Sequence, residues 1–138
     1  MGRKEAMRTQ DKYYVGNIIK ARRYLIASLL LAVAGALYEL FSHGVYSNYM
    51  IYAFAIPLVM GCLPYLADGS EIIKRAGPTA EILLLASIIT LSIGSIIKGV
   101  LEIYGTTNFL TKAYPILGAG LVIASVAVGI TNIKKAAI

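Results

Sequence analysis

The sequence predicts an all-α integral membrane protein, a four-helix bundle made of two antiparallel helical hairpins. Hydrophobic residues make up 58% of the 138 residues and charged residues only 14%, whereas soluble domains carry about 25% charged residues. The apolar residues fall into four blocks, each long enough for the ~17–25 residues with which a helix crosses a bilayer. No block alternates with period two, so helices are favoured over a membrane barrel.

The four blocks define one membrane domain, residues 20–132, between two basic cytoplasmic tails. Residues 1–19 form the longer tail and residues 133–138 the shorter one. We expect the transmembrane helices at about residues 20–43, 49–67, 80–104 and 113–132. The first block begins too far into the chain, and is too long, to be a secretory signal peptide, and no small-residue cleavage site follows it.

Glycine and proline set the expected ends of the first two helices. Gly44 follows the first block and favours a left-handed cap there. The short turn after it predicts a tight antiparallel hairpin. Pro57 and Pro64 lie inside the second block and are expected to kink that helix, since proline removes a backbone donor.

The second hairpin follows the longest predicted connection, residues 68–80. Thr79 is the expected N-cap of the third helix, and the carboxylate of Glu81 favours the positive helix N-terminus. Pro115 lies in the first turn of the fourth helix, where proline is tolerated.

Lysine and arginine predict the orientation, because cytoplasmic loops carry the excess of these residues. The chain has 13 of them and a formal net charge of +6. Eleven lie in the two terminal regions and the central loop, whereas Lys112 alone lies on the opposite side and Lys98 lies within the third helix. This bias predicts a multi-pass protein of the cytoplasmic (plasma) membrane with both termini in the cytoplasm.

A shift of 63 residues aligns the first and third helices and places Glu39 on Glu102. Two hairpins of the same orientation would form a parallel repeat about an axis along the membrane normal. The alternative is that two apolar halves align by chance. If the duplication is real, the two glutamates lie at equivalent depth.

Ionisable groups inside a membrane are the best indicators of a site. Glu39 and His43 are spaced four residues apart, as are Lys98 and Glu102, and all four lie toward the outer helix ends. Stripes of small and polar residues on the first and third helices predict that these helices face each other. The candidate ligand- or proton-binding residues are therefore Glu39, His43, Lys98 and Glu102, with Tyr49 and Tyr52 of the dense outer tyrosine belt.

Three interpretations of this cluster remain open. An ion pair between Lys98 and either glutamate would hold the helices in register. A ligand-binding or proton-carrying cluster would give the residues a functional role. Alternatively, the charged side chains extend to the outer headgroups.

Other kinds of chemistry find little support. One histidine falls short of a tetrahedral zinc site within one chain, so neither a metal nor a cofactor is expected. Neighbouring side chains on one helix point in different directions, so Ser42, His43 and Glu39 make a poor triad. No phosphate-binding loop is present, and the basic residues lack the interleaved aromatics of a nucleic-acid platform. No catalytic residues are assigned.

The predicted function is that of a non-enzymatic accessory or interaction subunit of a membrane assembly, with other membrane subunits or a second copy as its partner. The first alternative is a small proton- or ion-coupled transporter or channel that uses the outward cluster. The second is a membrane redox or lipid-modifying subunit. In size and layout the chain is similar to small multidrug transporters, which also have four helices and a glutamate in the first. It departs from that family in the outer position of Glu39 and in its loops and aromatic pattern.

Overall fold

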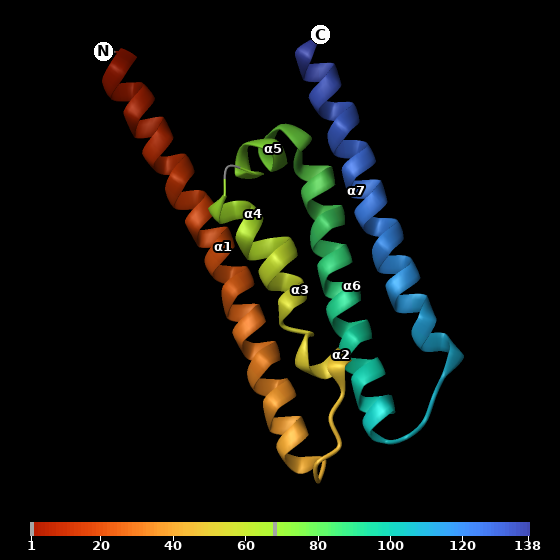
Figure 1. Cartoon of the computed structure of the whole chain (residues 1–138). Coiled ribbons are helices and arrows are strands. Elements are labelled where there is room, and N and C mark those ends of the chain that lie inside the picture. Colours follow the sequence, from red (N-terminus) through yellow and green to blue (C-terminus); the bar gives the residue numbers. More distant parts are fainter. Residues whose placement is uncertain (1, 68) are drawn as a thin grey trace.

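The computed structural model describes residues 2–67 and 69–138, and within these ranges every regular element is helical (Figure 1). Residues 1 and 68, which belong to the predicted tail and central loop, lie outside the described residues. The predicted all-α class is therefore confirmed for the part of the chain that the structure describes. The chain runs up and down in four segments, each antiparallel to the next, and three of them are long helices.

Helix α1, Gly2–Phe41, is 40 residues long and includes the residues predicted to form a tail. It begins about 18 residues before the expected start, because hydropathy marks the apolar part of a helix and carries no signal for a polar continuation. It ends at Phe41, so His43 lies in the following turn with φ of 57°. Gly44, with φ of 89°, adopts the left-handed conformation predicted for it.

The second segment is broken rather than singly kinked. It consists of α2 (Asn48–Ile51), α3 (Ala55–Pro57), the π-helical turn η1 (Leu58–Cys62) and α4 (Leu63–Leu66). Proline explains part of this irregularity, since Pro57 lacks an N–H and immediately precedes the π-helical turn. The break at residues 52–54 contains no proline and was not predicted.

The break releases two backbone carbonyls, and side chains of the flanking helices bind both. Ala53 donates to the carbonyl of Met50, which leaves the carbonyl of Tyr49 free to accept from Ser95 Oγ at 2.7 Å. Leu58 donates to Ala55, and the carbonyl of Phe54 accepts from Ser28 Oγ at 2.8 Å. Serine hydroxyls thus satisfy backbone groups that an unbroken helix would satisfy internally.

A short helix, α5 (Gly69–Ala76), connects the second segment to α6 (Pro78–Ile103). The N-cap of α6 is Gly77, with φ of 89°, and Pro78 is its first residue. The expected N-cap, Thr79, is therefore already inside the helix. Proline at the first helical position explains the earlier start, because its fixed φ suits that position.

The chain then passes through a 3₁₀ turn, η2 (Phe109–Lys112), into α7 (Ala113–Ala137), which packs along α6. Glycines permit this close contact: a Cβ on Gly94 would overlap Cβ of Tyr114. Toward the other end of α7, Ser125 Oγ donates to the carbonyl of Ala80 at 2.7 Å. Asn132 Nδ2 donates to the carbonyl of Ala76, also at 2.7 Å.

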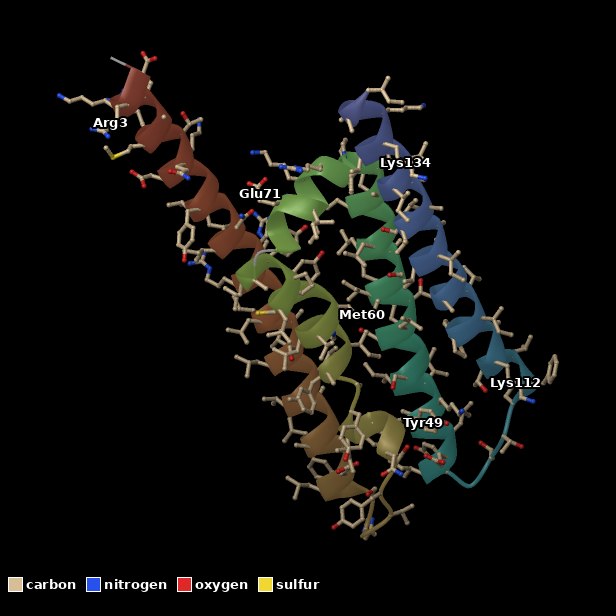
Figure 2. The ribbon with its side chains drawn as sticks, turned by 45° about the horizontal axis from the view of Figure 1, so that its top comes forward. Arg3, Tyr49, Met60, Glu71, Lys112 and Lys134 are labelled. Atoms are coloured by element: carbon tan, nitrogen blue, oxygen red, sulfur yellow. The ribbon has the colours of Figure 1, made fainter. Side chains whose placement is uncertain are left out.

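The segments pack mainly on their neighbours in sequence: α1 on the broken segment, the broken segment on α6, and α6 on α7. Both chain ends and α5 lie at one end of the molecule, which we call the terminal end (Figure 1). The turns after α1 and α6 lie at the opposite end, which we call the far end. Figure 2 shows Arg3, Glu71 and Lys134 toward the terminal end, with Tyr49 and Lys112 away from it.

Among the described residues, three helical stretches are long and apolar enough to cross a membrane: Gly2–Phe41, Pro78–Ile103 and Phe109–Ala137. In their most apolar windows only 11%, 28% and 17% of the residues, respectively, are buried inside the protein. The broken segment contributes a shorter apolar stretch, Ala55–Leu66. The fold therefore turns much of its apolar surface outward.

Candidate functional site

Gly35 of α1 and Gly99 of α6 both meet the broken segment that lies between these helices, so α1 and α6 do not face each other there as predicted. A Cβ on Gly35 of α1 would lie 3.1 Å from the carbonyl oxygen of Met50, and one on Gly99 of α6 would lie 3.0 Å from Cβ of Met50. Met50 is 4% exposed. The short helix α2 thus occupies the seam that the sequence assigned to α1 and α6, because the break moves its backbone between them.

The structure brings Lys98 and Tyr49 together at this seam. Lys98 Nζ donates to Tyr49 Oη at 2.7 Å and lies 3.9 Å from the centroid of the tyrosine ring. The ammonium group therefore gains a hydrogen bond and a cation–π contact. Neither ion pair found among the described residues joins Lys98 to Glu39 or Glu102. The predicted ion-pair arrangement is replaced here by a lysine–tyrosine contact.

Glu102 is bound from the broken segment as well. Its Oε2 accepts a hydrogen bond from Ser47 Oγ, and Ser47 itself is 1% exposed. Ser47 immediately precedes α2. This contact and the Lys98–Tyr49 contact both tie α6 to the start of the broken segment.

Glu39 is the unusual member of the candidate cluster. Its Oε1 is buried and has no hydrogen-bond partner among the described residues. Since α1 ends at Phe41, His43 does not share a helix face with Glu39 as predicted. His43 and Tyr52 are both exposed, and Tyr52 lies at the break after α2. Lys98 and Glu102 thus each contact the start of the broken segment, at Tyr49 and Ser47, whereas His43 and Tyr52 lie on the surface.

A cavity of about 290 Å³ lies beside Lys98, between the broken segment, α6 and the start of α7. Tyr49, Ser95 and Lys98 supply its polar walls. Apolar walls and glycine complete it: Ile56, Leu91, Gly94 and Pro115. The cavity is a place in the far-end half of the molecule where a small polar species could approach the Lys98 ammonium.

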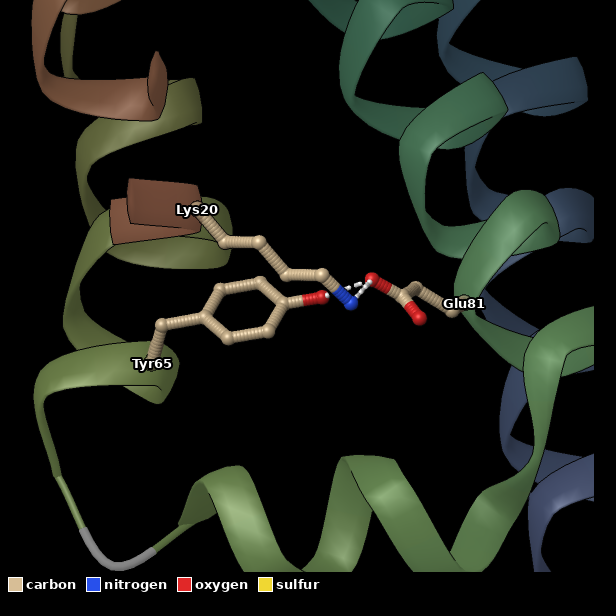
Figure 3. Close-up of polar contacts among 3 residues, drawn as sticks. All are labelled: Lys20, Tyr65 and Glu81. Carbon is tan, nitrogen blue, oxygen red and sulfur yellow. Dashed lines mark hydrogen bonds and ion pairs between the residues drawn. The ribbon is translucent and has the colours of Figure 1, made fainter. Parts of the chain in front are cut away.

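A second polar cluster, at the terminal end, joins α1, α4 and α6 (Figure 3). Glu81 Oε1 accepts from Lys20 Nζ at 2.5 Å and from Tyr65 Oη at 2.6 Å. The Tyr65 ring stacks on Tyr24 with centroids 5.8 Å apart, and Lys20 Nζ lies 5.5 Å from the Tyr65 centroid. The three polar groups therefore hold three segments together.

Sequence reasoning did not assemble this cluster, although its signal was present. Lys20, Tyr65 and Glu81 each lie at an expected inner helix boundary, so the predicted topology places them at one depth. Glu81 was assigned only to the helix N-terminus. Depth alone would have suggested that a cation, a phenol and a carboxylate at one boundary interact.

The only cysteine, Cys62, is 2% exposed and packs with Ala21 and Tyr65 beside this cluster. In the described ranges, no three His, Cys, Asp or Glu side chains gather in a way that could hold a metal ion. Comparison with protein-family models, curated proteins and solved structures finds no match to the chain.

Proposed function

We propose that the chain is a multi-pass protein of the plasma membrane that crosses the bilayer four times, with both termini in the cytoplasm. The three long apolar helices support this placement. The distribution of charge supports it as well. Both chain ends and α5 lie at the terminal end, and eleven of the 13 lysines and arginines are in the terminal regions and the central loop. The broken segment is the fourth crossing, and its freed carbonyls have partners, as a low-dielectric surrounding requires.

Within that membrane we propose that it acts as a non-enzymatic accessory subunit, which binds a partner through an N-terminal arm, residues 2–15 of α1. A 40-residue helix is ~60 Å long, about twice the ~30 Å hydrocarbon core, so α1 extends well beyond the other segments. Figure 1 shows the arm standing apart from every other element. Every described side chain of the arm is exposed.

The lack of packing on this arm is the observation that carries the proposal. Most helical stability in proteins comes from packing an amphipathic face, and an isolated helix of ~12–15 residues is marginal in water. Met7 and Tyr14 are two turns apart on one side of the arm and are 56% and 70% exposed. A partner helix that packs on these two side chains would provide the missing stabilisation.

Native mass spectrometry of the chain, extracted from its own membranes in mild detergent, tests this function. We expect a mass that contains a second, different protein. A variant that lacks residues 2–15 is expected to lose that protein but keep the melting temperature of the remaining helices. The double substitution of Met7 and Tyr14 by glutamine is the milder version, with Arg3→Gln and Thr9→Gln as the matched control. A full chain that appears only as a monomer or homodimer would overturn the proposal.

A second candidate, a proton- or ion-coupled transporter or channel, is favoured by the buried, unpartnered oxygen of Glu39. An intramembrane carboxylate without a partner is a candidate ion or proton carrier. Glu39→Gln and Lys98→Ala, alone and combined, distinguish transport from packing. A transporter loses ion or drug flux in liposomes while its stability is kept. If Glu39 and Lys98 are only structural, each single substitution lowers stability and flux is absent from the wild type.

A further inference from the structure

Helix α1 packs on the broken segment through residues that follow a regular spacing. Ala21, Ser28 and Gly35 are buried, lie seven residues apart, and each rests against the broken segment. The half-buried residues between and beside them complete the pattern: Asn17, Tyr24, Leu31 and Tyr38. Alternate steps of four and three residues form the heptad repeat with which two helices pack side by side. We call this line of residues the heptad face of α1.

The heptad face continues into the arm, beyond the point where the broken segment ends. The same steps, counted back from Asn17, lead to Tyr14, Gln10 and Met7. These three residues are exposed, whereas the seven residues of the repeat that follow them are buried or half-buried. Helix α4 ends at Leu66, and the chain then turns away into α5 (Figure 1). Among the described residues, no helix therefore covers the heptad face of the arm.

The exposed part of the heptad face has the composition of a helix-packing surface. Met7 and Tyr14 are 56% and 70% exposed. Gln10 lies between them, and one polar residue at such a position fixes the register of a helix pair at some cost in stability. Asp11 flanks the face beside Gln10, and flanking charges select the partner of a packed helix. Asp11 is exposed, and neither ion pair among the described residues includes it.

We infer that the partner contributes one amphipathic α-helix, which packs on Met7, Gln10 and Tyr14 and continues the heptad face where the broken segment stops. Its residues opposite Met7 and Tyr14 are apolar, and a hydrogen-bonding side chain lies opposite Gln10. A lysine or arginine on its flank pairs with Asp11. The inference rests on the accessory function proposed above, and it names the structure and the charge of the partner that the arm binds.

The bilayer is a poor alternative occupant of this face. Along the helix axis, Met7 lies 13 residues, or ~20 Å, beyond Lys20, which belongs to the expected inner membrane boundary. Charge at a membrane surface is screened within ~8 Å at physiological ionic strength. A straight α1 therefore carries its exposed heptad face away from the lipid headgroups and into the space of a neighbouring protein.

A second copy of the chain is disfavoured by charge. Two copies in one membrane project their arms in the same direction, so the arms could pair only in parallel. Each arm, residues 2–15, contains four lysines and arginines against two acidic residues. Parallel pairing would place these two net positive charges side by side at the same height, and like-charge repulsion opposes such a contact. A partner of different sequence avoids this repulsion and can supply the cation for Asp11.

Site-specific photocrosslinking in the protein's own membranes tests the inference. The photoreactive residue p-benzoylphenylalanine replaces Met7 or Tyr14 on the heptad face. In separate chains it replaces Glu5 or Lys12, an exposed pair with the same spacing on the opposite face. We expect the Met7 and Tyr14 positions to give about tenfold more product with a second protein. Tandem mass spectrometry of these products should place the two crosslinks about seven residues apart on one helix of the partner.

A charge reversal tests the contact of Asp11. With the photoreactive residue at Tyr14, Asp11→Lys is expected to lower the yield of product about fivefold, because attraction to a cation becomes repulsion. Glu5→Lys makes the same change of charge on the opposite face and should leave the yield within about twofold. Both side chains are exposed, and circular dichroism establishes that each variant is folded.

Equal yields from the two faces of the arm would overturn the inference, and so would products formed mainly with lipid or with a second copy of the chain. Equal effects of Asp11→Lys and Glu5→Lys would overturn it as well. The accessory function fails in a different way, because native mass spectrometry would then find no second protein and neither face would crosslink to one. A second protein that is found in the mass spectrum but crosslinks equally from both faces would leave the function standing and overturn only the inference.

Discussion

Tyr65 shows how one side chain links three segments of the protein. Its ring stacks on Tyr24 of α1, and its hydroxyl donates to Glu81 of α6. It is 5% exposed, so its hydroxyl has little access to water if that partner is removed. Burial and a charged acceptor both make this hydrogen bond worth more than one at the surface.

We predict that Tyr65→Phe lowers the free energy of unfolding by about 1–2 kcal/mol. The ring keeps its stack on Tyr24, so the loss reports the hydroxyl alone. Tyr14→Phe is the matched control, because Tyr14 is 70% exposed and is expected to change nothing. Unfolding by sodium dodecyl sulfate in mixed micelles, followed by circular dichroism, measures both. Equal stability of the two variants would show that the Tyr65–Glu81 bond contributes nothing.

At this scale the sequence predicted residue types better than residue pairs. An ion pair between Lys98 and a glutamate was one of three interpretations, and its pairing with Glu39 assumed that α1 faces α6. In the structure Tyr49 lies within reach of Lys98 instead, since α2 lies in the seam. Partners on a broken segment depend on backbone geometry, which residue spacing on regular helices does not encode.

The contact between α6 and α7 depends on a glycine. A Cβ on Gly94 would overlap Cβ of Tyr114, an atom fixed to the backbone that has no freedom to rotate away. Overpacking of this kind typically costs ~1–3 kcal/mol.

Gly94→Ala is therefore expected to lower stability by about 1–3 kcal/mol. Gly120→Ala is the control on α7, because a Cβ there meets no atom within 4 Å. Its effect should stay within about 0.5 kcal/mol. The same unfolding assay in mixed micelles compares the two variants. If Gly120→Ala lowers the free energy of unfolding as much as Gly94→Ala does, close packing at Gly94 is not the cause of the loss.

The broken segment makes a separate prediction. Ser28→Ala and Ser95→Ala each leave a freed carbonyl unbonded, that of Phe54 or of Tyr49. Each should cost about 1 kcal/mol, in the range of hydrogen bonds between membrane helices. In the double variant the two losses of unfolding free energy should add, because the two hydrogen bonds use separate donors and acceptors.

Thr131→Ala supplies the reference for these serines. Thr131 Oγ1 donates at 2.8 Å to the carbonyl of Ala127 on its own helix, so its removal frees no interhelical partner. We expect its stability to match the wild type. If Thr131→Ala lowers the free energy of unfolding as much as the serine substitutions do, the hydrogen bonds to the freed carbonyls contribute no more than a bond within one helix.

The elements were predicted where hydropathy carries the information. The centres of the four segments, the positive φ of Gly44 and the proline irregularity of the second segment all follow from composition and local chemistry. The polar N-terminal continuation of α1 and the break at residues 52–54 do not, since neither changes the hydropathy profile. Side chains of α1 and α6 bind the carbonyls that are freed in the broken segment, and these contacts between segments are not encoded in hydropathy.

The whole molecule has two chemically different ends, and this difference makes the proposed orientation testable. The terminal end holds both chain ends and most of the basic residues, whereas the far-end turns are short. Transfer of many cations across a membrane is unfavourable, so the basic end is expected to stay in the cytoplasm.

Thiol labelling of intact cells measures this orientation. In a Cys62→Ala background, Thr107→Cys at the far end should react with a membrane-impermeant maleimide. Lys4→Cys and Lys135→Cys at the terminal end should react only after the cells are permeabilised. Cys62 is 2% exposed, and alanine is chosen because it is apolar and close to cysteine in size. Labelling of Lys4→Cys and Lys135→Cys in intact cells, with Thr107→Cys protected, would mean that the chain inserts in the opposite direction.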